Sequence, residues 1–191
     1  MSNHGVMLTT PKPCLFLDRD GVIIKNVPYS KDPETVELML GIERLVASAK
    51  AKNYWVIVVT NQSGIGRGWL TLADYQAITE RMLSFLKPHG AEPDKIYYAP
   101  YYEKSTISEF LAKPHWRKPG TGMFDQACVD FSIDLTKSVM VGDRASDLEA
   151  AHNAGVSRHF LLHSEDYEKE QGLVAPGIAY QFVNSLDEIK L

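Results

Sequence analysis

The sequence is poor in the features that mark secreted, membrane and nucleic-acid-binding proteins. Only two cysteines, Cys14 and Cys128, occur in 191 residues, which argues against a disulfide framework and favours reduced thiols. No run reaches the roughly 20 apolar residues that span a bilayer, and residues 1–13 lack the apolar core of a signal peptide. The net charge of −4 provides no basic excess for binding a phosphate backbone. We therefore expect a cytoplasmic protein with no membrane and no nucleic-acid partner.

The common nucleotide and metal motifs are also missing. Residues 64–68 contain three glycines but match neither the phosphate-loop nor the dinucleotide pattern, and we expect them to form a loop. The six histidines show no metal-ligand spacing. No repeat or linker divides the chain, and a hydrophobic fraction of 45% supports a sizeable core. We predict one domain over residues 1–191 and expect a monomer, although no motif bears on the oligomeric state.

Apolar runs alternate with amphipathic segments along the chain. The pattern predicts strands at residues 14–17, 55–59, 95–99, 138–141, 158–162 and 180–183, and helices at 41–52, 71–86, 121–131, 147–153 and 186–189. Ser146 and Ser185 are expected to cap the last two helices. Such alternation is typical of an α/β fold, and we predict a three-layer, doubly wound, Rossmann-like parallel sheet.

The spacing of the strand ends bears on how the sheet is covered. The intervals from residue 20 to 60 and from 60 to 118 hold little more than one helix, one strand and loops. A separate cap domain would need at least ~50 further residues in one of them. We therefore predict no cap domain and an open cleft whose walls are loops. The longest irregular segment runs from residue 100 to residue 117.

Two aspartates, Asp18 and Asp20, follow the first predicted strand directly. Side chains two apart in an extended segment point the same way, so both carboxylates are expected to face one spot beyond the strand. Open α/β sheets bind ligands at these carboxyl ends. An isolated Asp-x-Asp is also common in turns, because Asp favours turns. The interpretation therefore depends on what the other strand ends supply.

The other strand ends supply residue types that phosphoryl transfer needs. Asp18 is placed to attack phosphorus, and Asp20 to protonate the leaving oxygen. Thr60 and Asn61, after the second strand, would donate hydrogen bonds to phosphate oxygens, and Lys118 would bring positive charge. Each has a plainer interpretation as well, since Thr60 and Asn61 could be ordinary strand-end residues and Lys118 a solvated surface cation.

Carboxylates that face a phosphate require a hard cation between them. Mg²⁺ suits oxygen ligands and is commonly held by one or two carboxylates and the substrate phosphate. Asp143, at the end of the strand at residues 138–141, is the candidate for the other carboxylate. Asp147 lies in the first turn of the next helix. There it is either an acidic residue that the helix dipole stabilises or a residue that assists the metal.

Four segments resemble the signatures of the haloacid dehalogenase (HAD) superfamily of phosphatases. They are residues 17–21, 60–68, 117–119 and 141–143, and the resemblance extends over residues 12–184. Together they most resemble the D,D-heptose 1,7-bisphosphate phosphatase and histidinol-phosphatase branch. The resemblance implies a nucleophile at Asp18, an acid/base at Asp20, phosphate stabilisers at Thr60 and Lys118, and Mg²⁺ held by Asp18, the backbone carbonyl of Asp20, and Asp143. It also implies substrate contacts from Asn26 to Tyr29 and from Asn61, Gln62, Ser63, Arg117 and Arg144.

The chain departs from this branch in one place. Members often carry a zinc loop, with Cys-x-His after the third strand and Cys-x-Cys before the Arg-Lys-Pro segment. Ala99 and Tyr101 stand at the first pair here, and Pro114 and Trp116 at the second, so a Cys₃His site cannot form. We predict no structural zinc and a surface or packing role for His115. Aromatic side chains are expected to fill the loop instead, namely Tyr97, Tyr98, Tyr101, Tyr102 and Trp116.

The sequence thus predicts a Mg²⁺-dependent phosphatase that works through an aspartyl-phosphate. The favoured substrate is D-glycero-D-manno-heptose 1,7-bisphosphate or a related sugar phosphate. Because the loop beside the site has changed, histidinol phosphate and a broad range of phosphomonoesters stay open as alternatives. A catalytically silent binding protein on the same fold is a further alternative, disfavoured by the complete set of Asp18, Asp20, Thr60, Lys118 and Asp143.

Overall fold

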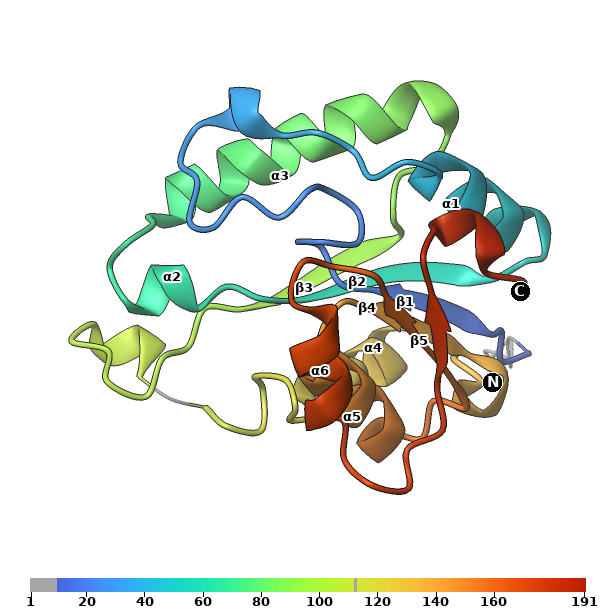
Figure 1. Cartoon of the computed structure of the whole chain (residues 1–191). Helices are drawn as coiled ribbons and strands as arrows, with labels where there is room; N and C mark the ends of the chain where they lie inside the picture. Colours follow the sequence, from blue (N-terminus) through green and yellow to red (C-terminus); the bar gives the residue numbers. More distant parts are fainter. Residues whose placement is uncertain (1–9, 112) are drawn as a thin grey trace, which may run out of the picture.

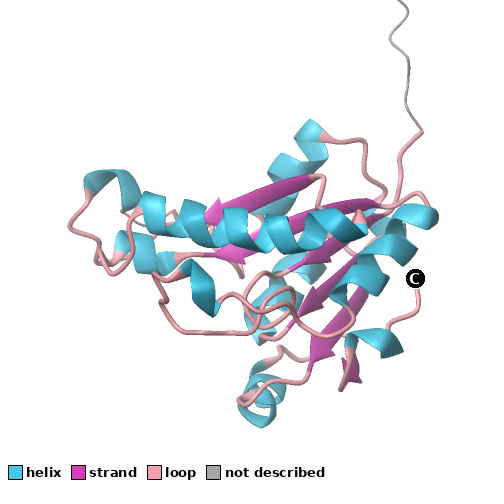
Figure 2. Ribbon diagram, turned by 90° about the horizontal axis from the view of Figure 1, so that it is seen from above, coloured by secondary structure: helices cyan, strands magenta, loops and turns pink. Residues whose placement is uncertain are grey.

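The apolar runs of the chain pair into one parallel sheet. The computed structural model describes residues 10–111 and 113–191, so most of the segment searched for a signal peptide lies outside the described residues. Six strands lie in the order β3-β2-β1-β4-β5-β6, with every pair parallel. Their bounds are β1 Cys14–Leu17, β2 Trp55–Asn61, β3 Lys95–Ala99, β4 Val139–Gly142, β5 Arg158–Leu162 and β6 Gln181–Val183. Because every pair is parallel, the strands all end at the same edge of the sheet, and Figure 2 shows the sheet from above.

Helices cover both faces of the sheet, as Figure 1 shows. One face carries α1 (Ile42–Ala51) and α3 (Leu72–Leu86), and the other carries α4 (Gly122–Asp130), α5 (Ala145–Ala154) and α6 (Tyr167–Leu173). Successive side chains of β1 serve the two layers in turn, because a strand alternates its faces. Leu15 and Leu17 pack in the core under α1 and α3, whereas Cys14 and Phe16 pack against α4 and α5. The predicted three-layer fold is confirmed.

Cap residues account for several helix boundaries. Thr71 accepts from the backbone of Asp74, whose carboxylate in turn accepts from the backbone of Thr71, so this capping box fixes the start of α3. Gly155 ends α5 in a left-handed conformation with a φ of 94°. Both cysteines are free thiols, as predicted. In the described residues, no helix combines the length and the apolar character that crossing a bilayer demands.

The structure corrects the sequence-based prediction at four places. Residues 63–66, expected in part as a glycine loop, form the short helix α2, Ser63–Gly66. Ser146 does not cap α5, which begins at Ala145 after the N-cap residue Arg144. The final helix is a single 3₁₀ turn, Leu186–Glu188, capped by Ser185. The polar segment after β5 contains α6, which has no buried residue and therefore left no apolar periodicity to read.

Candidate active site

The centre of the sheet brings two of the predicted aspartates together. Asp18 directly follows β1 and Asp143 directly follows β4, and these two strands are neighbours. The backbone N–H of Asp18 donates to the carbonyl of Val141 at 3.1 Å, which extends the pairing to the strand ends. Asp18 and Asp143 are both buried. The two halves of the chain therefore contribute one carboxylate each to the same spot.

Lys118 crosses from the other side of the site and ties two carboxylates together. Its Nζ lies 2.9 Å from Oδ1 of Asp18 and 2.7 Å from Oδ1 of Asp147. It also donates to the carbonyl of Val59 in β2 at 2.6 Å. All three protons of the ammonium group are thus engaged. Burial alone would lower the pKa of Lys118, but Asp147 and Asp18 more than offset it, so its pKa is raised and it stays charged.

Three buried carboxylates lie together beside Lys118, which pairs with two of them. Asp18, Asp143 and Asp147 each offer an oxygen within 4.8 Å of the others. Burial raises the pKa of Asp143 to about 8, and the charges of Asp18 and Asp147 add to the shift. Burial likewise raises the pKa of Asp18 to about 6, against the pull of Lys118. Oδ1 of Asp143 is buried with no hydrogen-bond partner among the described residues. An oxygen-lined site with excess negative charge and an orphaned acceptor fits a hard divalent cation.

Two glycines make room for these carboxylates. Gly21 has a φ of +86°, and a Cβ built there would lie 2.3 Å from Oδ2 of Asp143. Gly142 makes room for Asp147 in the same way, because a Cβ built at Gly142 would lie 2.3 Å from the Cβ of Asp147. Any side chain at either position would push a carboxylate out of the cluster.

The carboxylate of Asp20 is held by two neighbours. Arg19 donates to both of its oxygens, from Nε at 3.2 Å and from Nη2 at 3.0 Å. Gln62 donates to Oδ2 of Asp20 at 2.7 Å and to Oγ1 of Thr60 at 3.0 Å. Because the Thr60 hydroxyl accepts from Gln62, its own proton is left to donate elsewhere. Gln62 was predicted as a substrate contact, but its amide nitrogen joins two other site residues.

Asn61 has a comparable internal role. Its Oδ1 accepts from the backbone N–H of Lys118, and its Nδ2 donates to the carbonyl of the same residue, both at 3.0 Å. This two-point contact fixes the loop that carries Lys118. Asn61 also lines the cavity described below, and its predicted contact with phosphate or substrate stays a prediction.

A cavity of about 560 Å³ opens over these residues. Asp18, Asp20 and Lys118 lie among the residues that line it. The other predicted substrate contacts, Asn26, Tyr29, Ser63, Arg117 and Arg144, also line this cavity. Thr60 is not among the lining residues, and it is reached through Gln62. The structure thus brings most of the predicted positions to one cavity, whereas Thr60 and Asp143 are not among its lining residues. Asn61 and Gln62 line the cavity and also have hydrogen-bond partners within the protein.

Aromatic groups hold the segment that replaces the zinc loop. The indole N–H of Trp116 donates to the carbonyl of Tyr98 at 2.9 Å. The rings of Tyr98 and Tyr75 pack together with their centroids 4.5 Å apart. Tyr101 and Trp116 pack against the core under α4. His115 is exposed and pairs with Asp125 at 3.1 Å. Tyr97 belongs to the same core cluster, and its hydroxyl donates to Asp130 at the end of α4.

Several further residues of the site could not be assigned from sequence patterns. Asp147 was left open between a helix-dipole role and the metal, and it lies inside the carboxylate cluster. Arg19, which holds Asp20, is buried, and no role was predicted for it. Glu170 of α6 accepts from the backbone N–H of Ala145 at 2.9 Å and so supports the start of α5. No spacing rule connects residues so far apart in the chain.

Known proteins resemble this chain over most of its length. The family model described as HAD-hydrolase-like matches residues 115–189. The D-glycero-alpha-D-manno-heptose-1,7-bisphosphate 7-phosphatase of Burkholderia mallei is 39% identical over 152 residues, covering 80% of each chain. The D-glycero-beta-D-manno-heptose-1,7-bisphosphate 7-phosphatase of Rhodopseudomonas palustris is 36% identical over 157 residues, covering 82% of this chain and 87% of that protein. A crystal structure of D,D-heptose 1,7-bisphosphate phosphatase from B. bronchiseptica, complexed with magnesium and phosphate, superposes with a TM-score of 0.76 at 26% identity, covering 91% of this chain and 93% of that one.

Proposed function

Since the chain belongs to the HAD-like hydrolase family, among the heptose-1,7-bisphosphate 7-phosphatases, we propose that it is a Mg²⁺-dependent phosphatase that removes the 7-phosphate of D-glycero-D-manno-heptose 1,7-bisphosphate. One observation carries the proposal. The buried carboxylates of Asp18, Asp143 and Asp147 lie together, Lys118 pairs with only two of them, Asp18 and Asp147, and Oδ1 of Asp143 has no partner among the described residues. Such a centre is costly to bury unless a cation and an anionic substrate complete it.

The chain's own residues divide the reaction into two steps. Asp18 attacks phosphorus to form an aspartyl-phosphate, and the bond to the leaving sugar oxygen breaks. Asp20 gives that oxygen its proton and then takes a proton from the water that hydrolyses the aspartyl-phosphate. Arg19 and Gln62 keep the Asp20 carboxylate in place for both transfers. The products are the heptose 1-phosphate and inorganic phosphate.

Lys118 and Thr60 stabilise the transferring group in different ways. Lys118 orients Asp18 and places a full positive charge beside the phosphoryl group, although all its protons are engaged within the protein. The free proton of the Thr60 hydroxyl is available to a phosphoryl oxygen. Asn61 acts through Lys118 by fixing its backbone, and is therefore a positioning residue.

The carboxylate cluster is the metal site. Asp18, Asp143 and the backbone carbonyl of Asp20 would hold Mg²⁺, with Asp147 beside them. Bound there, Mg²⁺ supplies the positive charge that offsets repulsion between the carboxylates and the phosphate oxygens. Lys118 supplies further positive charge against the same repulsion.

The names of the relatives favour one substrate among the alternatives. The relatives reported above act on a heptose bisphosphate by name, which favours that substrate over histidinol phosphate. Both anomers occur among those names, so we propose no preference between them. The predicted catalytic set is complete, with Asp18, Asp20 and Lys118 lining one cavity, Thr60 joined to Asp20 through Gln62, and Asp143 close to Asp18, and this supports an enzyme over a silent binding protein. The expectations of one domain, of a monomer, of a cytoplasmic location and of no nucleic-acid partner stay predictions.

Substitution of the nucleophile tests the proposal. We expect Asp18→Asn to abolish phosphate release from the heptose bisphosphate and from p-nitrophenyl phosphate in Mg²⁺, because an amide cannot form the aspartyl-phosphate. Circular dichroism would verify that the variant keeps its fold, and Glu109→Gln, an exposed position outside the site, serves as the matched control. Hydrolysis at the wild-type rate in the folded Asp18→Asn variant would refute the mechanism.

A further inference from the structure

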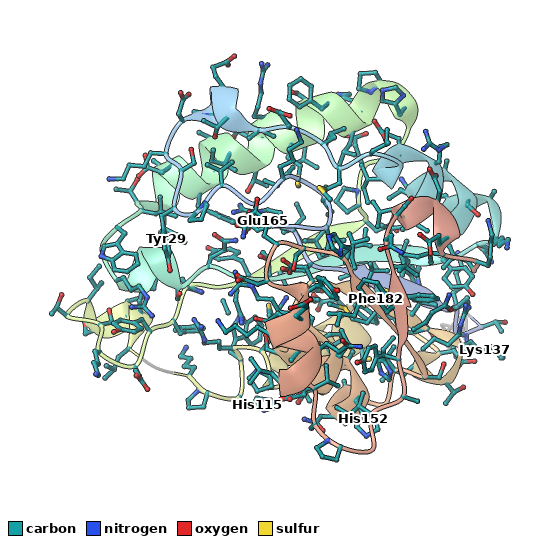
Figure 3. The ribbon with its side chains drawn as sticks, in the orientation of Figure 1. Tyr29, His115, Lys137, His152, Glu165 and Phe182 are labelled. Atoms are coloured by element: carbon teal, nitrogen blue, oxygen red, sulfur yellow. The ribbon has the colours of Figure 1, made fainter. Side chains whose placement is uncertain are left out.

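Helix α6 is held in place by aromatic rings rather than by core packing. None of its residues is buried. Tyr167, in its first turn, packs against His163 and Phe182, with ring centroids 4.7 Å and 5.2 Å apart. Phe182 belongs to β6, the edge strand of the sheet, and lies beside α6 in Figure 3. A surface helix fixed in this way can present a polar side chain to a neighbouring element.

One carboxylate of α6 reaches the start of α5. Oε2 of Glu170 accepts a hydrogen bond from the backbone N–H of Ala145 at 2.9 Å. Ala145 is the first residue of α5, and the N–H groups in the first turn of a helix have no acceptor within that helix. The bond is partly buried and Ala145 itself is buried, so loss of the carboxylate would leave this donor poorly solvated.

Ala145 lies between two acids of the carboxylate cluster. Asp143 precedes it by two residues, and Asp147 follows it by two. Asp147 is also held by Lys118 at 2.7 Å, whereas Oδ1 of Asp143 has no hydrogen-bond partner among the described residues. Glu170 thus fixes, from outside α5, the backbone that connects the two acids.

The position of this turn determines the shape of the metal site. Asp143 and Asp147 each offer an oxygen within 4.8 Å of one from Asp18, so the first turn of α5 sets two of the separations in the cluster. Mg²⁺ is small and tolerates little departure from octahedral geometry. A displacement of the turn that the fold itself would tolerate is therefore enough to weaken Mg²⁺ binding.

We propose that Glu170 is a positioning residue of the active site, which acts through its hydrogen bond to α5 to hold Asp143 and Asp147 at the spacing that binds Mg²⁺. The inference rests on the proposed function, because it requires the carboxylate cluster to be the metal site. The negative charge of Glu170 also interacts with Arg144, which lines the reaction cavity. The experiment therefore has to separate the hydrogen bond from the charge.

Three substitutions of Glu170 make this separation. Glu170→Ala removes the acceptor and the charge. Glu170→Gln removes the charge, but its side-chain oxygen can still accept from Ala145. Glu170→Asp keeps the charge on a side chain that is one methylene too short for the same bond. Glu168→Ala is the matched control, because Glu168 carries the same charge in the first turn of the same helix and is exposed.

Mg²⁺ binding is measured without substrate, and activity is measured in parallel. Mg²⁺ is titrated into each protein, and its Kd is obtained from the rise in Tm. The Mg²⁺ concentration that gives half-maximal hydrolysis of p-nitrophenyl phosphate is the second readout. A bond that is merely structural would lower Tm in EDTA and leave the Kd for Mg²⁺ at the wild-type value.

We expect the Kd for Mg²⁺ to rise about 10-fold or more in Glu170→Ala and Glu170→Asp, because partners that orient metal ligands commonly have effects of this size. The concentration for half-maximal activity should rise by a similar factor. Glu170→Gln should stay within about threefold of the wild type, since a neutral acceptor keeps the bond in a weaker form. Glu168→Ala should match the wild type in both readouts.

The outcomes separate this inference from the proposed function. An unchanged Kd for Mg²⁺ in Glu170→Ala, or in Glu170→Asp if Glu170→Ala does not fold, would overturn the inference alone. Equal losses in Glu170→Ala and Glu170→Gln, with Glu170→Asp at the wild-type value, would also overturn it and assign the effect to the charge beside Arg144. A wild type that neither binds Mg²⁺ nor hydrolyses phosphate esters would overturn the proposed function, and the inference with it.

Discussion

Replacement of Asp143 by asparagine should make the metal-free protein more stable while it removes activity. Folding buries this carboxylate beside two others and raises its pKa from 3.8 to about 8. At pH 7 that shift costs up to about 4 kcal/mol of folding free energy. Asp18 and Asp147 share the repulsion, so we expect Asp143→Asn to recover roughly 2 kcal/mol, which corresponds to a rise of about 4–8 °C in Tm for a chain of this size.

The pH dependence of this effect follows from the direction of the shift. A group whose pKa is raised on folding leaves stability intact below its unfolded pKa and lowers it as the pH rises through the folded value. The advantage of Asp143→Asn should therefore be small near pH 4, grow toward pH 8 and level off above it. Mg²⁺ should reverse the order, because saturation at 100 times Kd would stabilise the wild type by about 2.7 kcal/mol and leave the variant unchanged.

Thermal unfolding followed by circular dichroism checks both expectations. The two proteins are compared in EDTA and in Mg²⁺ from pH 5 to pH 8.5, with Glu109→Gln as the control for one lost negative charge at an exposed position. Phosphate release is measured in parallel. Equal Tm values for wild type and Asp143→Asn in EDTA at pH 8, or a difference that does not vary with pH, would refute the account of charge crowding.

Three further predictions concern the framework of the site. Lys118→Met should destabilise the metal-free protein by about 3–5 kcal/mol in urea unfolding, because it leaves Asp18 and Asp147 buried without their cation; a change below 1 kcal/mol would contradict this. Asn61→Ala should lower kcat for p-nitrophenyl phosphate about 10-fold or more with little change in KM, since the loop of Lys118 loses two hydrogen bonds of about 1 kcal/mol each; an effect confined to KM would point to a direct substrate contact instead. Elemental analysis of the purified protein should find no stoichiometric zinc, and one zinc per chain would overturn the expectation drawn from Ala99, Tyr101, Pro114 and Trp116.

The buried strands could be located from the sequence, whereas two of the helices could not. Buried strands such as β1 and β4 are continuous apolar runs, so their ends could be located and Asp18 and Asp143 expected to meet. Helix α6 could not be found, because it buries no side chain and its polar sequence resembles a loop. Helix α2 was missed because two of its four residues are glycines, which the packed backbone of Pro100 and Tyr102 requires at Gly66.

The hydrogen-bond partners of side chains within the site could not be predicted from the sequence. Spacing predicts which strand end a residue occupies, but it carries no information on rotamers. Gln62 and Asn61 could therefore be placed at the cavity, whereas their bonds to Asp20 and to Lys118 depend on loops that meet only in three dimensions. The stacking of Arg67 on Tyr102 likewise joins two loops that no pattern connects.

The position of β1 between β2 and β4 has a consequence for synthesis of the chain. Residues 14–17 pair on one side with a strand that follows early and on the other with residues 139–142, more than 120 residues later. The amino-terminal part of a chain is synthesised first and emerges from the ribosome first. The nascent polypeptide thus contains Asp18 long before Asp143 and Asp147 exist, so the proposed active site can form only after the ribosome has passed β4 and the start of α5.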